Sequence, residues 1–205
     1  MEEKRISEQE SLLIIQQMIQ SAKQEQRDNG LGWIIWGWLV FSASLLTWFN
    51  LKYDWFSNYF FWNMFGILGG LMMLYTIFSN FFFKKRQKVR TYTGDLFKQL
   101  DVGFFIVLAL IILSMNLGVS PVKGFALLTG LIGFWILIYG TALNFKPSIA
   151  GAYITWAISF VALFLRENQF DITMLLQALS ALAGYIIPGH IANKEFKKIN
   201  RSLSV

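Results

Sequence analysis

Between two largely apolar halves of the chain lies the stretch Lys84-Lys85-Arg86-Gln87-Lys88-Val89-Arg90. Basic residues beside apolar runs stay on the cytoplasmic side of a bilayer, and each Lys or Arg near the surface attracts anionic headgroups with about 1 kcal/mol. We call residues 84–90 the basic segment and predict that it faces the cytoplasm. Its charged side chains are predicted to contact anionic lipid: Lys84, Lys85, Arg86, Lys88 and Arg90.

Composition agrees with a membrane protein. Of the 205 residues 55% are hydrophobic and only 15% are charged, whereas soluble domains carry about 25% charged residues. The chain has no Cys, which excludes disulfides, thiolate nucleophiles and Cys-based metal sites. The net charge of +6 comes from basic residues that flank apolar runs, so we expect the lipid bilayer as a partner and not nucleic acid.

Six apolar runs of 18 to 21 residues contain no Asp, Glu, Lys or Arg. At 1.5 Å per helical residue, each run is long enough to cross a hydrocarbon core of about 30 Å. We predict an all-α integral membrane protein with six transmembrane helices and a cytoplasmic N-terminal amphipathic helix. The predicted domains are residues 1–30 (amphipathic helix), 31–193 (transmembrane domain) and 194–205 (basic cytoplasmic tail). The predicted spans are 31–49, 59–79, 102–119, 124–143, 148–165 and 172–191.

Orientation follows from the positions of the basic residues. With the N-terminus inside, fifteen of the 18 Lys and Arg residues fall in cytoplasmic segments, and only Lys52, Lys123 and Arg166 fall in outer loops. Such an asymmetry over short loops is the positive-inside signal. We therefore predict that both termini are cytoplasmic.

The N-terminal 30 residues are predicted to form the amphipathic helix. Ser7 and Glu10 have the spacing of a capping box, and Asn29-Gly30 is a suitable stop. A helix that lies on a membrane usually carries Lys and Arg on its polar face, but here that face is mostly Gln and residues 1–30 hold six acidic against four basic groups. The apolar face is therefore predicted to dock on a protein partner, on a second copy or on the basic segment. It consists of Leu12, Ile15, Met18, Ile19 and Ala22.

Two hairpins of the chain resemble each other weakly. Residues 80–85 and 193–198 share the pattern Asn-x-x-Phe-Lys-Lys. Duplicated hairpins related about the membrane normal occur in transporters, whereas aromatic and Lys residues are also common at any cytoplasmic helix end. Both interpretations stay open.

Residues that could carry chemistry are few. No predicted span contains a carboxylate, whereas catalysis within a membrane usually needs ionisable groups facing a cavity. Asp95 and Asp101 precede the third run and are interpreted as solvated acids that balance nearby basic residues, with cation binding as the alternative. His190 is a candidate pH-sensitive residue, with an interfacial anchor as the alternative. We expect no enzymatic activity, cofactor or metal.

Polar and small residues within the runs favour helix packing. Small residues let helix backbones approach closely, and hydroxyl and amide groups bond between helices. Asn63, Thr129, Thr155, Ser159 and Gln177 are interpreted in this way, with a route for a neutral solute as the alternative.

The chain also resembles a known family. The pattern Glu10-Ser11-Leu12 … Asn29-Gly30, followed by Trp36-Gly37-Trp38-Leu39-Val40-Phe41 and by Ile187-Pro188-Gly189-His190, is similar to a family of six-span bacterial inner-membrane proteins without an assigned activity. The position of His190 is commonly Tyr there. The resemblance implies a location in the bacterial inner (plasma) membrane, and no chemistry.

Three functions remain as expectations. The first is a non-enzymatic scaffold or regulatory subunit that recruits a partner through its N-terminal helix. The alternative is a small transporter or channel for a neutral or weakly polar solute, which requires a water-accessible cavity among the second, fourth and sixth spans. A lipid-modifying enzyme requires an acid or His facing a cavity near the headgroups.

Overall fold

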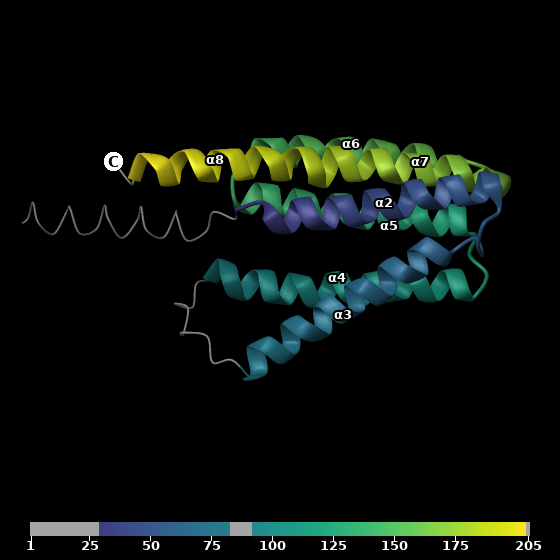
Figure 1. The fold of residues 1–205 in the computed structure, drawn as a ribbon, viewed down its shortest axis with the longest axis horizontal. Coiled ribbons are helices and arrows are strands. Elements are labelled where there is room, and N and C mark those ends of the chain that lie inside the picture. Colours follow the sequence, from purple (N-terminus) through teal and green to yellow (C-terminus); the bar gives the residue numbers. More distant parts are fainter. Residues whose placement is uncertain (1–28, 83–91, 204–205) are drawn as a thin grey trace, which may run out of the picture.

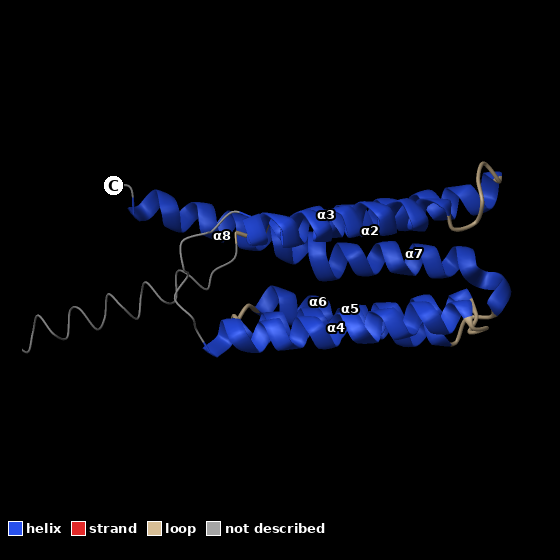
Figure 2. Cartoon of the chain, turned by 90° about the horizontal axis from the view of Figure 1, so that it is seen from below, coloured by secondary structure: helices blue, strands red, loops and turns tan. Residues whose placement is uncertain are grey.

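The computed structural model describes residues 29–82 and 92–203, and every regular element among them is a helix (Figures 1 and 2). The basic segment and the predicted N-terminal helix lie outside these ranges. In chain order, the elements are α2 (Leu31–Tyr53), α3 (Phe60–Phe82), α4 (Tyr92–Asn116), α5 (Pro121–Ala142), α6 (Lys146–Leu163), the 3₁₀ turn η1 (Glu167–Gln169), α7 (Phe170–Ala181), the π-helix η2 (Leu182–Ile186) and α8 (Ile187–Leu203).

Polar side chains fix where the helices begin and end. Asn50 accepts a hydrogen bond from the Phe56 backbone N–H and donates to the Phe56 and Ser57 carbonyls, at 2.8 to 3.1 Å, so it holds the loop after α2. The Ser120 side chain caps α5, with Pro121 in the first turn, where its missing N–H costs nothing. The Lys123 ammonium donates to the Leu165 carbonyl at 2.9 Å and to that of Leu163, which satisfies carbonyls at the end of α6.

The core is built from α2, α5, α6 and the continuous rod α7–η2–α8. Helices α5 and α6 form a closely packed hairpin, and α2 packs along α7. Helices α3 and α4 are peripheral, since α3 packs on α2 and α4 packs on α5. Figure 1 draws α3 across α4, whereas Figure 2 separates the two helices into different layers.

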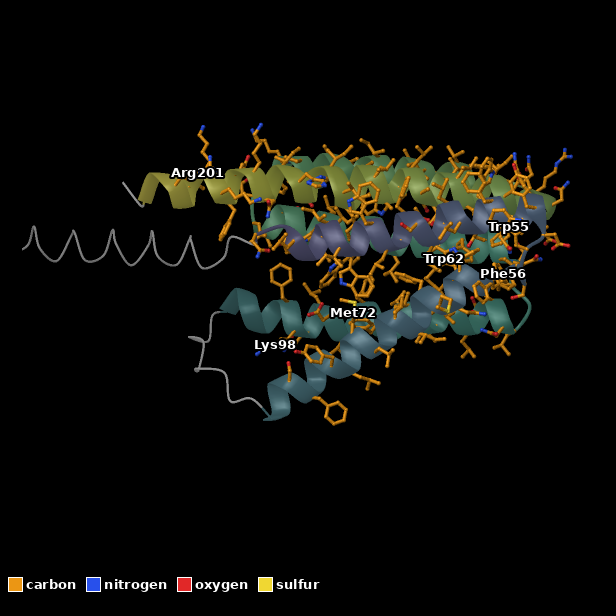
Figure 3. The ribbon with its side chains drawn as sticks, in the orientation of Figure 1. Trp55, Phe56, Trp62, Met72, Lys98 and Arg201 are labelled. Atoms are coloured by element: carbon orange, nitrogen blue, oxygen red, sulfur yellow. The ribbon has the colours of Figure 1, made fainter. Side chains whose placement is uncertain are left out.

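The buried interior of this core mixes apolar side chains with many small polar ones, and large apolar side chains cover the exterior. Ser44, Thr47 and Thr155 are fully buried, whereas large side chains such as Ile67, Leu71 and Phe160 are exposed; Figure 3 shows side chains covering the outside of the bundle. An apolar exterior on this scale would be costly in water. In lipid it is favourable, and small residues then allow close helix packing.

Four helices are long and apolar enough to cross a membrane: Leu31–Tyr53, Phe97–Asn116, Pro121–Ala142 and the rod Glu167–Ile199. Together with the apolar exterior, they indicate a membrane protein. A shorter apolar stretch, Phe60–Met72, lies in α3. All six predicted runs coincide with helices, but a six-span count goes beyond the four candidates and stays a prediction.

Two helices extend well past their predicted runs. Helix α4 begins at Tyr92, whereas the third run was predicted from Val102. The sixth run was predicted to stop at Ile191, but α8 continues to Leu203 through residues predicted to be a tail. Charged residues end a membrane span without ending a helix, because Lys, Arg and Glu are good helix formers.

Candidate functional site

A cavity of about 440 Å³ opens at the end of the bundle where α2 begins, α5 ends and α6 begins. We call it the end cavity. Its volume is in the range of small-molecule sites. It is lined by Gly30, Trp33, Tyr139, Ala142, Leu143, Asn144, Phe145, Ser148, Pro188, Gly189, Ala192, Glu195, Phe196 and Ile199. The lining therefore combines apolar and aromatic side chains with one carboxylate (Glu195), one amide (Asn144) and two hydroxyls (Ser148 and Tyr139).

The N-terminal side of α2 is fastened to α8 at the rim of this cavity. Gly30 has φ +71°, and a Cβ at this position would stand 2.5 Å from the Gly189 carbonyl oxygen, so the residue requires both the left-handed backbone and the small size of glycine. The Asn193 side-chain amide donates to the Asn29 carbonyl at 2.8 Å. The hydrogen bond and the close approach thus fix Asn29 and Gly30 against α8.

Aromatic rings form one wall of the cavity. The Trp33 ring lies 4.5 Å from that of Tyr139 and 5.1 Å from that of Tyr185, centroid to centroid. Phe97 of α4 contacts Tyr139 at 6.1 Å. Tilted pairs at these distances are favourable. Three core helices and the peripheral α4 are therefore joined at this end by ring contacts.

Helix α8 presents opposite chemistry on its two faces. At 100° per residue, the residues of α8 that line the cavity fall within an arc of roughly 120°: Pro188, Gly189, Ala192, Glu195, Phe196 and Ile199. The basic residues of α8 occupy the opposite side and are exposed, as Figure 3 shows for Arg201: Lys194, Lys197, Lys198 and Arg201. Glu195 is thus a carboxylate on the otherwise uncharged cavity face of a basic helix.

The inner end of the cavity reaches a distorted part of the last helix. The Ile187 N–H bonds to the Leu182 carbonyl, five residues back, which is the π-helical pattern of η2. Pro188 has no N–H, so a carbonyl one turn earlier lacks its usual donor. The Ala183 carbonyl points at α6, where it would lie 2.5 Å from a Cβ on Gly151. Glycine at 151 therefore permits the distorted turn to pack against α6.

Polar groups in the middle of the bundle bond between helices. The Thr129 hydroxyl lies within hydrogen-bond distance of the Gln177 side-chain carbonyl. Ser159 donates to the Ala126 carbonyl at 2.8 Å, and the Trp156 indole N–H donates to the Gly130 carbonyl at 2.9 Å. For these residues the structure agrees with the interpretation that they bond between helices. Thr155 differs, because its buried hydroxyl has no hydrogen-bond partner in the described part of the chain.

The predicted site residues are not brought together in the described ranges. The lipid-contacting residues of the basic segment and the docking face of residues 12–22 lie outside them. His190 is exposed on α8 and does not line the cavity. Asp101 is exposed on α4, and Asn63 is exposed on α3. Among residues 29–82 and 92–203, no three His, Asp or Glu side chains are placed to hold a metal ion.

Glu195 and the aromatic wall were missed from sequence because the sixth run was ended at Ile191. Extending the helical period past that point places Glu195 on the face of Ala192, Phe196 and Ile199. The helical period of α8 could therefore have been read from the sequence. The contact of this face with Trp33 and Tyr139 could not, because it depends on how three helices meet.

No family model, curated protein or solved structure matches this chain. The resemblance to a bacterial inner-membrane family therefore stays a prediction.

The end cavity is suited to binding. The Ser148 hydroxyl, which lines it, already donates to the Ile136 carbonyl at 3.2 Å. Glu195 is exposed and stands at the mouth. The cavity required for a transporter was expected among the second, fourth and sixth spans. The end cavity is instead lined from α2, α5, α6 and α8, and α3 contributes nothing to it.

Proposed function

We propose that this chain is a non-enzymatic membrane scaffold or regulatory subunit of the bacterial inner membrane, with six spans and both termini in the cytoplasm. Its N-terminal segment recruits a cytoplasmic partner, and its transmembrane bundle anchors that complex. The basic segment holds the bundle against anionic lipid. His190 has no part in this proposal, since it faces away from the cavity.

One observation carries the proposal: the junction between the N-terminal segment and the bundle is fixed. Asn193 and the carbonyl of Gly189, both on α8, hold Asn29 and Gly30 in place. A recruiting segment transmits position or force to its anchor only if the two are joined rigidly. A flexible tether would need neither a left-handed glycine nor a side-chain clamp at this point.

The packing of the bundle centre supports the same function. The polar side chains there bond to neighbouring helices: Thr129, Ser159 and Gln177. These groups are therefore not free to line a route for a solute. An anchor requires such a closed centre.

The test is affinity purification of the tagged chain from native membranes, followed by mass spectrometry. We expect a specific partner with the full-length chain and none with a chain lacking residues 1–28. Asn193→Ala is expected to weaken partner recovery, because it releases the junction. Lys198→Ala, on the exposed face of the same helix, serves as the matched control and is expected to have no effect.

Recovery of the same partners with and without residues 1–28 would refute recruitment by this segment. Equal thermal unfolding midpoints for the two chains in detergent are required for the comparison. They show that the truncated chain is folded.

A transporter is the second candidate, favoured by the π-helix η2 and Pro188 in the last candidate span. Interrupted helices supply binding sites in many transporters. Uptake of neutral solutes into proteoliposomes, compared with protein-free liposomes, distinguishes the two functions. A scaffold gives no flux above the control.

A further inference from the structure

We propose that the end cavity binds the ammonium group of an amine-bearing phospholipid headgroup. This inference does not depend on the recruiting role of the N-terminal segment. It follows from the charge, the aromatic lining and the position of the cavity, in that order.

The charge is provided by Glu195. Every Lys and Arg of α8 lies on the opposite, exposed face, and the remaining residues that line the cavity are uncharged. A negative charge on the cavity side of a basic helix selects a cation over an anion. A carboxylate–ammonium hydrogen bond is among the stronger polar contacts in proteins.

The aromatic lining suits the same ligand. Trp33, Tyr139, Phe145 and Phe196 all line the cavity and all are half-buried. The faces of aromatic rings attract ammonium groups, and cages of this type recognise primary and quaternary amines. Trp33 and Tyr139, which contact each other at 4.5 Å, are held in place by packing, so the wall exists before the ligand binds.

The position of the cavity identifies the source of the amine. It opens where the candidate spans α2 and α5 begin and end, which is the level of lipid headgroups in a bilayer. Lys146, the first residue of α6, follows the lining residue Phe145 and is exposed at the same end. It is available to the phosphate of a headgroup whose amine enters the cavity.

The experiment is native mass spectrometry of the purified full-length chain with three phospholipids that share the same acyl chains. The retention of phosphatidylethanolamine and phosphatidylcholine is compared with that of phosphatidylglycerol, which has no amine and is also attracted to the basic segment. Glu195→Gln is expected to lower this retention ratio about tenfold. Glu167→Gln changes an exposed carboxylate in the loop after α6, and is expected to keep it.

A retention ratio that Glu195→Gln leaves unchanged would overturn the proposal. A second variant, Phe196→Leu, tests the aromatic wall. We expect a severalfold weaker preference with an unchanged thermal unfolding midpoint.

Competition by soluble compounds tests which group is recognised. Ethanolamine and tetramethylammonium are expected to displace the bound lipid from the wild-type chain. Displacement by glycerophosphate, which has no amine, but by neither simple amine would assign recognition to the phosphate, and would refute the ammonium site.

Discussion

Thr155 shows how a single side chain departs from the pattern of this bundle. It is fully buried in α6, and its hydroxyl has no partner among the described residues. Gly184 of the π-helix η2 lies beside it, since a Cβ added there would stand 2.8 Å from the hydroxyl oxygen. A buried unpaired hydroxyl costs about 1–3 kcal/mol. The residue is therefore a local weakness beside the π-helix.

Thr155→Val is expected to stabilise the protein by about 1 kcal/mol, since it replaces the unpaired hydroxyl with a methyl group of similar size. The measurement is the thermal unfolding midpoint in detergent. Ser159→Ala is the matched control on the same helix. It removes the bond to the Ala126 carbonyl and is expected to destabilise by about 0.6 kcal/mol. A lower midpoint for Thr155→Val would show that the hydroxyl is partnered.

At the scale of elements, the distorted turn of the last helix depends on its neighbour. Pro188 and η2 expose the Ala183 carbonyl, and α6 accommodates it because residue 151 has no side chain. A proline within a helix removes one backbone hydrogen bond and usually kinks or ends the helix. The helix instead continues to Leu203, because the π-helical turn absorbs the missing hydrogen bond.

Gly151→Ala is expected to destabilise the bundle by about 1–3 kcal/mol, because its Cβ would meet a backbone oxygen that cannot rotate away. Gly66→Ala on α3 is the control. An added Cβ there has no neighbour within 4 Å, so stability is expected to stay the same or rise slightly. Chemical unfolding of both variants in mixed micelles provides the comparison. Equal stability of the two variants would contradict the close approach of α6 and η2.

At the scale of the whole molecule, a compact four-part core carries two peripheral helices. Helix α3 packs mainly on α2, with Trp62 reaching Phe125 of α5 and Met174 of α7, and α4 packs on α5. Ring contacts such as Trp36 to Phe65 at 5.8 Å join α3 to the core. Close packing at small residues was predicted for the apolar runs. Helix α5 does approach α6 closely at Gly133 and Gly140. In α3, by contrast, a Cβ added at Gly66 or Gly70 would meet no neighbour.

The predicted orientation is tested with single cysteines, because the chain has none of its own. Asn168→Cys, in the loop after α6, is expected to react with a membrane-impermeant maleimide in intact cells. Lys146→Cys, at the opposite end of α6, is expected to react only after permeabilisation. Both side chains are exposed, so accessibility to the reagent depends on the side of the membrane. The reverse pattern would invert the topology.

The sequence by itself determined the helical class and the membrane character of this protein. Long uncharged apolar runs have few stable conformations in lipid other than a helix. The helices could therefore be located to within a few residues, except where they extend into charged segments. The interhelical role of Thr129, Ser159 and Gln177 was also predictable, since polar groups in hydrocarbon need partners.

Only the tertiary structure decided which helices form the core, and where a cavity is left. Trp33 lies more than a hundred residues before both Tyr139 and Glu195 in the sequence. The three residues meet because α2, α5 and α8 converge at one end of the bundle. In lipid, hydropathy does not rank one helix partner over another; shape and hydrogen bonding do. Those depend on small differences between neighbouring surfaces, which no local pattern along the chain encodes.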